Sequence, residues 1–193
     1  MSNSNKSSQL RIVSDYLDFE ENRPHGIYFY MNQKNIYKNY ALIIGPKNTP
    51  YFGGFYLFQV DFPEDYPNKS PNLKLLTIDG RVRFNPNLYE CGKVCLSILG
   101  TWSGPSWTNV MTIRTVLLSV QSLLNDFPIR NEPGLEEVKQ DEQKSILYNN
   151  FLNYHNINLA MINILKNILY IELNKYNSTK QKKSKSKKRN NQK

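Results

Sequence analysis

The sequence predicts an α+β fold, in which a four-stranded antiparallel sheet follows an N-terminal helix and precedes C-terminal helices. Four segments of β-type composition succeed one another with short connections, which is the pattern of an antiparallel meander. Helical periodicity occurs before and after them, and strands followed by helices are typical of α+β layers. A chain of 193 residues with 39% apolar content can bury the core of one such domain. We expect this domain to span residues 7–176.

The first helix is expected over residues 7–21. Leu10, Val13 and Leu17 recur at helical spacing and define its apolar face, and Pro24 stops the helix. The polar face, which we expect to be solvated, carries Arg11 and four acidic residues, namely Asp15, Asp18, Glu20 and Glu21.

The four strands are expected over residues 27–31, 36–44, 55–62 and 73–78. A turn-like segment separates the first two, and Gly and Pro punctuate the loops between the others. The third strand has apolar side chains on both of its faces, so we place it centrally in the sheet.

Helices are expected again after residue 107. Thr108 is the predicted N-cap of the first, Pro128 ends it, and its apolar face is formed by Ile113, Leu117, Val120 and Leu124. Two further helices are expected over residues 136–149 and 151–176. The last one carries a broad apolar stripe, which we expect to pack on the protein's own core, formed by Met161, Ile164, Leu165, Ile168 and Leu169.

Residues 177–193 form a Lys-rich tail of low complexity, which we expect to be disordered. The net charge of the chain is +9, and eight basic residues of this tail account for all but one of these charges. The remaining body is therefore not a basic nucleic-acid binder by composition. The tail is a candidate for weak binding to RNA, acidic protein surfaces or a nuclear import receptor, and the alternative is a solvated extension.

The composition also bears on location. No apolar run reaches the roughly 18 residues that a membrane span needs, so we expect no membrane partner. The polar N-terminus lacks the apolar core of a secretion signal. The two cysteines, Cys91 and Cys95, are too few for a disulfide framework and fit a reducing compartment. We expect a cytoplasmic protein, with the nucleus as a second candidate location.

The segment of residues 83–107 is the most informative one for chemistry. It opens with the turn Asn85-Pro86-Asn87, in which Pro86 fixes φ near about −65° and can hold both amide side chains in set positions. Cys95 follows Asn87 by eight residues inside an apolar run. A free cysteine often behaves as a small buried hydrophobe, so Cys95 is either part of the core or a placed nucleophile.

Several chemistries lack the residues that they need. A cysteine hydrolase needs a base, normally His, and neither His25 nor His155 has the local pattern of a triad. A zinc site lacks ligands, because Cys91 and Cys95 have no second Cys pair or His pair beside them. No Gly-rich phosphate loop occurs. We therefore expect neither a metal nor a cofactor.

One chemistry remains for a cysteine without a base, namely the exchange of an acyl group between thiolates. A lysine amine can then attack the thioester, provided that the protein holds the carbonyl and stabilises the oxyanion. The side-chain amide of Asn87, on a rigid turn, is the type of donor that this task needs.

These residues resemble the signature of the ubiquitin-conjugating enzymes. That family has a His-Pro-Asn turn and then, eight residues after its Asn, the active-site Cys followed by Leu-x-Ile-Leu; this chain has Asn85-Pro86-Asn87, Cys95 and Leu96-Ser97-Ile98-Leu99. Further matches within residues 7–176 are Gly45-Pro46, Thr49-Pro50-Tyr51, Gly53-Gly54, Phe62-Pro63, Asp65-Tyr66-Pro67, Trp107 and Ser122-Leu123-Leu124. Residues 82–87, 92–105 and 131–134 are most similar to the Z-type members.

The resemblance implies the ubiquitin-conjugating fold and a ubiquitin-carrier activity. It implies that Cys95 is the thioester nucleophile and that Asn87 stabilises the oxyanion or the loop during attack by a lysine. Glu132 is the acid nearest to the family's gate position, where an acid positions the incoming lysine, and Asn131 lies beside it. No cofactor is implied, because the activating enzyme consumes the ATP. The alternative is a catalytically inactive binding scaffold of the same fold.

The implied partners are ubiquitin or a ubiquitin-like modifier, an activating enzyme, a ubiquitin ligase and a protein substrate. The Z-type similarity and the acidic first helix indicate the alternative, dual-specificity activating enzyme. The chain also departs from the family pattern. Asn85 replaces the usual His, Ser97 replaces the usual Asp, and the ligase-docking positions hold Asn68 and the segment 108–110.

Overall fold

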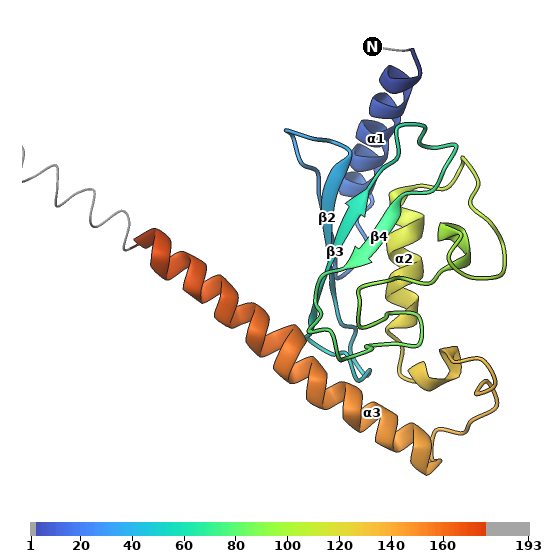
Figure 1. The fold of residues 1–193 in the computed structure, drawn as a ribbon, viewed down its shortest axis with the longest axis vertical. Coiled ribbons are helices and arrows are strands. Elements are labelled where there is room, and N and C mark those ends of the chain that lie inside the picture. Colours follow the sequence, from blue (N-terminus) through green and yellow to red (C-terminus); the bar gives the residue numbers. More distant parts are fainter. Residues whose placement is uncertain (1–2, 177–193) are drawn as a thin grey trace, which may run out of the picture.

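The predicted meander is confirmed by the computed structural model, which describes residues 3–176 (Figure 1). Helix α1 (Asn3–Glu21) precedes one antiparallel sheet with the strand order β1-β2-β3-β4. The strands are β1 (Ile27–Tyr30), β2 (Lys38–Ile44), β3 (Phe55–Asp61) and β4 (Asn72–Leu75). The Lys-rich tail and the properties expected of it lie outside the described residues.

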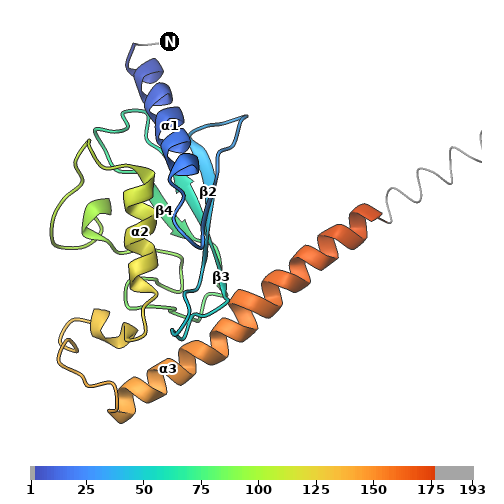
Figure 2. The ribbon, with the colours of Figure 1, turned by 180° about the vertical axis from the view of Figure 1, so that it is seen from behind.

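The hydrophobic core lies between the sheet and two helices. β3 runs between β2 and β4, as its two apolar faces predict, and buries Tyr56, Phe58 and Val60. Helix α2 (Ile113–Leu123) contacts both α1 and the sheet, and the view from behind shows α1 and α2 on the same side of it (Figure 2). The predicted apolar face of this helix is confirmed, because the four residues that form it are all buried.

The buried face of α1 differs from the predicted one. Leu10 and Leu17 are 64% and 61% exposed, whereas Ile12, Asp15 and Phe19 are buried. Both sets of residues have helical spacing, so the sequence pattern alone does not choose between them. The ring of Phe19 packs edge-on against a β1 aromatic ring, and Asp15 finds polar partners inside the protein, which fixes the rotation of the helix. The expectation that Asp15 belongs to a solvated face is therefore wrong.

The N-cap of α2 is Thr112, so the prediction of Thr108 is wrong. The hydroxyl of Thr112 accepts from the backbone N–H of Thr115 at 3.5 Å, and the hydroxyl of Thr115 accepts from the backbone N–H of Thr112 at 3.4 Å. This reciprocal capping box satisfies donors that the first helical turn leaves unpaired. Thr108 instead begins a backbone turn that precedes the helix.

The C-terminal part of the domain holds one long helix, where the sequence pattern predicts two. It consists of α3 (Gln143–His155), a π-helical stretch η3 (Asn156–Asn163) and an α-helical continuation to residue 176. Neither Gly nor Pro occurs between residues 135 and 176, so nothing in the chain breaks the helix near residue 150. Residues 136–142 form turns and not helix. Pro128 begins the short helix η2 (Pro128–Asn131) and does not end α2.

The middle of this long helix is fixed to the body. Leu152, Asn156 and Ala160, four residues apart, are all buried. The carbonyl oxygen of the Asn156 side chain accepts from the hydroxyl of Tyr56 at 2.8 Å, and its amide nitrogen donates to the backbone oxygen of Phe52 at 3.0 Å. A buried amide with partners on both sides sets the position of the helix along the sheet.

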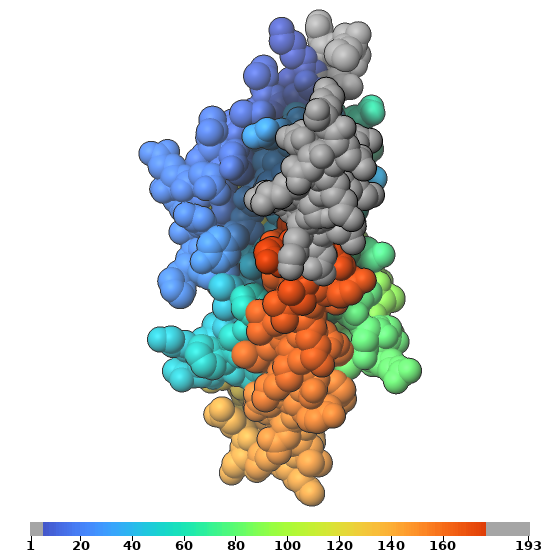
Figure 3. Space-filling model, turned by 90° about the vertical axis from the view of Figure 1, so that its left-hand side faces the viewer, coloured from blue at the N-terminus to red at the C-terminus, as the bar shows by residue number. Residues whose placement is uncertain are grey.

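Beyond residue 163 the helix runs away from the body (Figures 1 and 2), and in the view from that side it lies in front of the domain (Figure 3). Leu165, Ile168 and Leu169 are all more than half exposed, so the expectation that the stripe packs on the core is wrong for these three, whereas Met161 and Ile164 are half-buried. The reason is geometric, since a straight helix fixed near Asn156 leaves the surface of the sheet within two turns. None of the helices within residues 3–176 combines the length and apolar content that a membrane span requires.

Two leucines of the long helix provide a matched test of this arrangement. We expect Leu152→Ala to lower the free energy of unfolding by about 2–5 kcal/mol, because it opens a cavity in the core. Leu169→Ala should change it by less than about 0.5 kcal/mol, because that side chain is already 61% exposed. Urea unfolding followed by circular dichroism measures both. A similar loss in both variants would mean that the end of the helix packs on the domain.

Candidate functional site

The Asn85-Pro86-Asn87 turn is held by the fully buried side chain of Asn85. Its amide nitrogen donates to the hydroxyl of Tyr51 at 3.1 Å and to the backbone oxygen of Leu123, at the end of α2, at 2.8 Å. Its side-chain oxygen accepts from the backbone N–H of Asn87 at 2.9 Å. Pro86 keeps the turn narrow, and Asn85 connects it to α2.

Tyr51 provides the buried partner of Asn85. Its hydroxyl donates to the backbone oxygen of Phe84 at 2.8 Å and accepts from Asn85. Burial is the main cause that raises the pKa of Tyr51 well above its ordinary value of 10.0, with a further increase from Tyr148 and an opposing effect of the Asn85 hydrogen bond. The phenol therefore stays protonated near neutral pH and remains a hydrogen-bond donor.

Asn87 and Cys95, eight residues apart in the sequence, are paired directly. The backbone N–H of Cys95 donates to the backbone oxygen of Asn87 at 2.9 Å, and the side-chain amide of Asn87 donates to the backbone oxygen of Cys95 at 2.8 Å. This second bond is the contact that a loop-stabilising role of Asn87 requires. Cys91, by contrast, is exposed in the turn that closes between Tyr89 and Gly92.

The Cys95 residue is only 1% exposed, yet it is not a member of the main hydrophobic cluster, which includes its neighbour Val94. The loop of residues 100–106 turns back toward Ser97, two residues after Cys95. This loop approaches so closely that a Cβ at Gly104 would lie 3.0 Å from the Cβ of Ser97. Cys95 thus lies beside the main hydrophobic cluster and is not a member of it, so its burial alone does not make it a core residue.

The two predicted gate residues lie beside the turn. The side-chain amide of Asn131 donates to the side-chain oxygen of Asn85 at 3.3 Å. Glu132 forms an ion pair of 3.3 Å with Arg83, whose guanidinium also lies 4.2 Å from the ring centre of Tyr89. Because both members of the ion pair are partly exposed, it contributes at most about 1 kcal/mol. The structure therefore brings Asn131 and Glu132 to the Asn85 turn, which is itself bonded to the Cys95 loop.

A pocket of about 310 Å³ adjoins this group. It is lined on one side by Arg83, Pro86 and Glu132 and on the other by Tyr148 and Phe151 of α3. Burial raises the pKa of Tyr148 above its ordinary value. The charge of Arg83 lowers this pKa by a smaller amount, and that of Glu132 raises it further. The pocket is mainly apolar, with a single carboxylate at its edge.

The two histidines are placed elsewhere. His25 lies before β1, where its backbone oxygen accepts from the side chain of Gln121 at 2.9 Å. His155 lies on α3 with its ring 4.4 Å from that of Phe151. Within residues 3–176, no three His, Cys, Asp or Glu side chains are grouped so that they could hold a metal ion.

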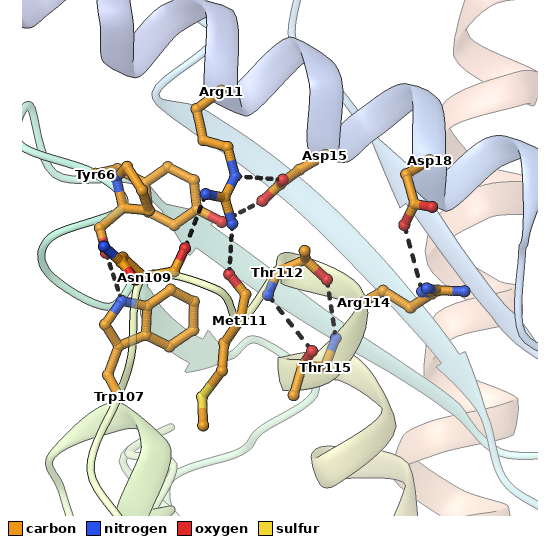
Figure 4. Close-up of polar contacts among 11 residues, drawn as sticks. Arg11, Asp15, Asp18, Tyr66, Trp107, Asn109, Met111, Thr112, Arg114 and Thr115 are labelled. Atoms are coloured by element: carbon orange, nitrogen blue, oxygen red, sulfur yellow. Dashed lines mark hydrogen bonds and ion pairs between the residues drawn. The ribbon is translucent and has the colours of Figure 1, made fainter.

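A second polar cluster connects α1 to two loops (Figure 4). The sequence pattern did not reveal it. The guanidinium of Arg11 donates to the carboxylate of Asp15 at 2.7 Å, and the hydroxyl of Tyr66 donates to the other oxygen of that carboxylate. Burial and the Asp15 hydrogen bond raise the pKa of Tyr66, so its phenol stays protonated. The spacing of Arg11 and Asp15 signals an ion pair, but nothing in the sequence points to Tyr66.

The same guanidinium holds the segment before α2. Arg11 donates to the backbone oxygen of Asn109 and to that of Met111, each at 2.8 Å (Figure 4). Val110 lies between these two carbonyl groups and is 81% exposed. Arg11 therefore fixes the backbone on both sides of an apolar side chain that points to solvent.

The loop of residues 63–68 is attached to this segment. The indole nitrogen of Trp107 donates to the backbone oxygen of Pro67 at 2.7 Å, and its ring lies 5.9 Å from that of Tyr66. The two positions that correspond to ligase docking, Asn68 and the segment 108–110, are thereby brought to one end of the domain.

Comparisons with known proteins agree with this arrangement. A family model described as "Ubiquitin-conjugating enzyme" matches residues 11–156. The chain is 42% identical over 158 residues to "Ubiquitin-conjugating enzyme E2 Z" of Homo sapiens, which covers 81% of this chain and 44% of that protein. The protein of the same name in Danio rerio is 42% identical over 165 residues, covering 83% of this chain and 50% of that protein.

A viral relative is similar as well. "Probable ubiquitin-conjugating enzyme E2 R521" of Acanthamoeba polyphaga mimivirus is 38% identical over 175 residues, covering 84% of this chain and 12% of that protein. The chain spans about half the length of the E2 Z relatives that it matches.

The buried amide of Asn85 gives the first prediction for this site. We expect Asn85→Ala to lower the free energy of unfolding by about 2–3 kcal/mol, because it leaves the partly buried Leu123 carbonyl and the buried Asn87 N–H unsatisfied. Asn131→Ala removes only a 3.3 Å bond at a half-buried position and should cost less than about 1 kcal/mol. Denaturant titration compares the two variants, and equal effects would contradict the central role of Asn85.

The Arg11 cluster gives a second prediction. A double-mutant cycle of Asp15→Asn and Tyr66→Phe should yield a coupling energy of about 1.5–3 kcal/mol, because the hydrogen bond joins a buried phenol to a carboxylate. The exposed pair of Asp18 and Arg114, at 3.4 Å, is the control and should yield less than about 1 kcal/mol (Figure 4). Thermal or urea unfolding provides the four free energies of each cycle.

Proposed function

This chain belongs to the ubiquitin-conjugating enzyme family, and from that premise we propose that it carries ubiquitin, or a ubiquitin-like modifier, as a thioester on Cys95. The observation that carries the proposal is the reciprocal pairing of Asn87 and Cys95 within the matched region. It favours Cys95 over Cys91, which lies exposed in a separate turn.

The proposed reaction has two steps. The thiolate of Cys95 attacks the carbonyl carbon of a modifier thioester on the activating enzyme, a new C–S bond forms, and the activating enzyme's thiolate leaves. A lysine amine then attacks the same carbonyl carbon, the C–N bond forms, the amine loses its proton, and the thiolate of Cys95 leaves. The chain needs no cofactor for either step, because the activating enzyme spends the ATP.

Asn87 and the gate residues have supporting roles in this proposal. In the described state the amide of Asn87 is bonded to the Cys95 backbone, which supports loop stabilisation over a free oxyanion donor. Glu132 is proposed to position the incoming lysine after exchanging its partner Arg83 for the amine, and Asn131 holds the gate segment onto Asn85. Because Cys95 is only 1% exposed, the groups that cover its thiol have to move before a partner's thioester can reach it.

The proposed partners are an activating enzyme, a ligase and a protein substrate. The E2 Z similarity supports the alternative, dual-specificity activating enzyme. For a ligase, the exposed Val110 supplies an apolar contact on a backbone that Arg11 holds, and this supports docking despite the polar Asn68. Two free cysteines support a reducing compartment, so we place the protein in the cytoplasm, with the nucleus as a second location.

The second candidate is a catalytically inactive scaffold of the same fold. The burial of Cys95 is the observation that favours it, because a binding module has no need of an accessible thiol. The two candidates differ in whether the chain forms a thioester.

A charging reaction decides between them. We expect a thiol-sensitive band with the added mass of one modifier on a non-reducing gel, because the nucleophile is a thiolate. The band should survive Cys91→Ala and disappear with Cys95→Ala. The panel should pair the standard and the alternative activating enzymes with ubiquitin and its relatives.

Each outcome of that panel distinguishes the carrier enzyme from the inactive scaffold or corrects the assigned nucleophile. Charging that persists in Cys95→Ala would show that the nucleophile has been assigned wrongly. The absence of charging in every pairing, with a known carrier enzyme as positive control, would favour the scaffold.

A further inference from the structure

Four consecutive main-chain groups around Cys95 are hydrogen-bonded, and two residues supply all the partners. Asn87 holds the inner two, the N–H and the C=O of Cys95, at 2.9 and 2.8 Å. Thr101 holds the outer two. Its hydroxyl donates to the backbone oxygen of Val94 at 2.8 Å and accepts from the backbone N–H of Leu96 at 3.0 Å. The residue that bears the thiol is thus fixed from both sides.

The hydrogen-bond capacity of Thr101 matches these two contacts. A hydroxyl has one proton to donate and two lone pairs to accept with. The backbone oxygen of Leu96 lies farther from it, at 3.2 Å, and already accepts from the backbone N–H groups of Leu99 and Thr101. The hydroxyl of Thr101 therefore donates its proton to the backbone oxygen of Val94, and one of its lone pairs accepts from the backbone N–H of Leu96.

Local chain geometry explains how Thr101 reaches this place. After the short helix η1 (Ser97–Leu99), Gly100 adopts the left-handed conformation with φ of 67°, and its N–H donates to the backbone oxygen of Ser97 at 2.9 Å. A Cβ at Gly100 would meet no atom within 4 Å, so glycine serves the backbone angle here and not the packing. The reversal brings Thr101, five residues beyond Leu96, back beside it.

We infer that Thr101 is a positioning residue for the Cys95 thiol. Its hydroxyl fixes the peptide groups before and after Cys95, which sets the direction of the Cα–Cβ bond and hence the approach of Sγ to a thioester carbonyl. Thr101 touches none of the reacting atoms and acts only through the backbone. The inference rests on the proposed carrier function for its effect on charging, but the positioning itself is a property of the free protein.

The hydroxyl, and not the β-methyl group, is what this role requires. Displacing a nucleophile by about 1 Å can cost a factor of about 100 in rate, so the loss of two bonds beside it should be measurable. Thr101→Val keeps the shape and removes both bonds, whereas Thr101→Ser keeps the hydroxyl. Ser103→Ala removes a hydroxyl from the same exposed loop and is the matched control.

The kinetic test is single-turnover charging of the full chain by the preformed ubiquitin thioester of an activating enzyme that charges the wild type. We expect Thr101→Val to lower the maximal rate about tenfold with little change in the half-saturating concentration, because docking is intact and the thiol is misplaced. Thr101→Ser and Ser103→Ala should stay within about twofold of the wild type. A wild-type rate in Thr101→Val, or an equal loss in Thr101→Ser, would overturn the inference.

A second measurement needs no activating enzyme. In a Cys91→Ala background, iodoacetamide alkylates only Cys95, and amide hydrogen exchange reports on Leu96. We expect Thr101→Val to speed both processes at least about threefold, because the backbone on both sides of Cys95 is loosened. Rates equal to the wild type would overturn the positioning role.

The two measurements separate the inference from the proposed function. If the wild type accepts no modifier, the carrier function fails, and alkylation and exchange alone decide the role of Thr101. If the wild type charges and Thr101→Val behaves like it, the inference fails while the carrier function stands.

Discussion

The side chain of Asn85 makes four hydrogen bonds inside the protein, and the arrangement around Cys95 depends on them. They join the turn to Tyr51, to the end of α2, to Asn87 and to Asn131 of η2. A neutral amide suits this place, because it offers donors and an acceptor at once and needs no counter-charge on burial. Asn87, held by the same residue, then reaches the backbone of Cys95. The replacement of the family's usual His is thus accommodated by partners that match an amide.

Two polar clusters hold different parts of the domain in place. The uncharged cluster around Asn85 fixes the backbone at Cys95 and the segment at Asn131. The Arg11 cluster, which contains a charged pair and a buried phenol, fixes the loop of residues 63–68 and the segment before α2 (Figure 4). Arg11 ends on the backbone carbonyl groups of Asn109 and Met111, so it holds this segment without depending on the segment's own side chains, whereas the loop of residues 63–68 is held through Tyr66. The consequence is that Thr108 and Val110 can differ from the family pattern while the backbone beneath them keeps its position.

The long C-terminal helix shows where a sequence pattern has two structural meanings. An apolar stripe at helical spacing is equally compatible with packing on the same domain and with exposure on a projecting helix. The burial of Leu152, Asn156 and Ala160 decides for packing in the middle of the helix, and its straight course then carries Leu165 and Leu169 away from the sheet. The same ambiguity explains the first helix, in which Ile12 and Phe19, and not Leu10 and Leu17, face the core.

The sequence by itself determined the meander, the apolar face of α2 and the spacing of Asn87 and Cys95, because these depend on neighbours within one element or one short loop. Only the tertiary structure decided which face of α1 is buried, which threonine caps α2 and where the long helix leaves the body. Each of these depends on a partner distant in the chain, such as Tyr66 for Asp15 or Tyr56 for Asn156. The position of the Thr101 hydroxyl depends on both. Thr101 lies only six residues from Cys95 in the sequence, but it reaches the backbone beside Cys95 only through the chain reversal at Gly100.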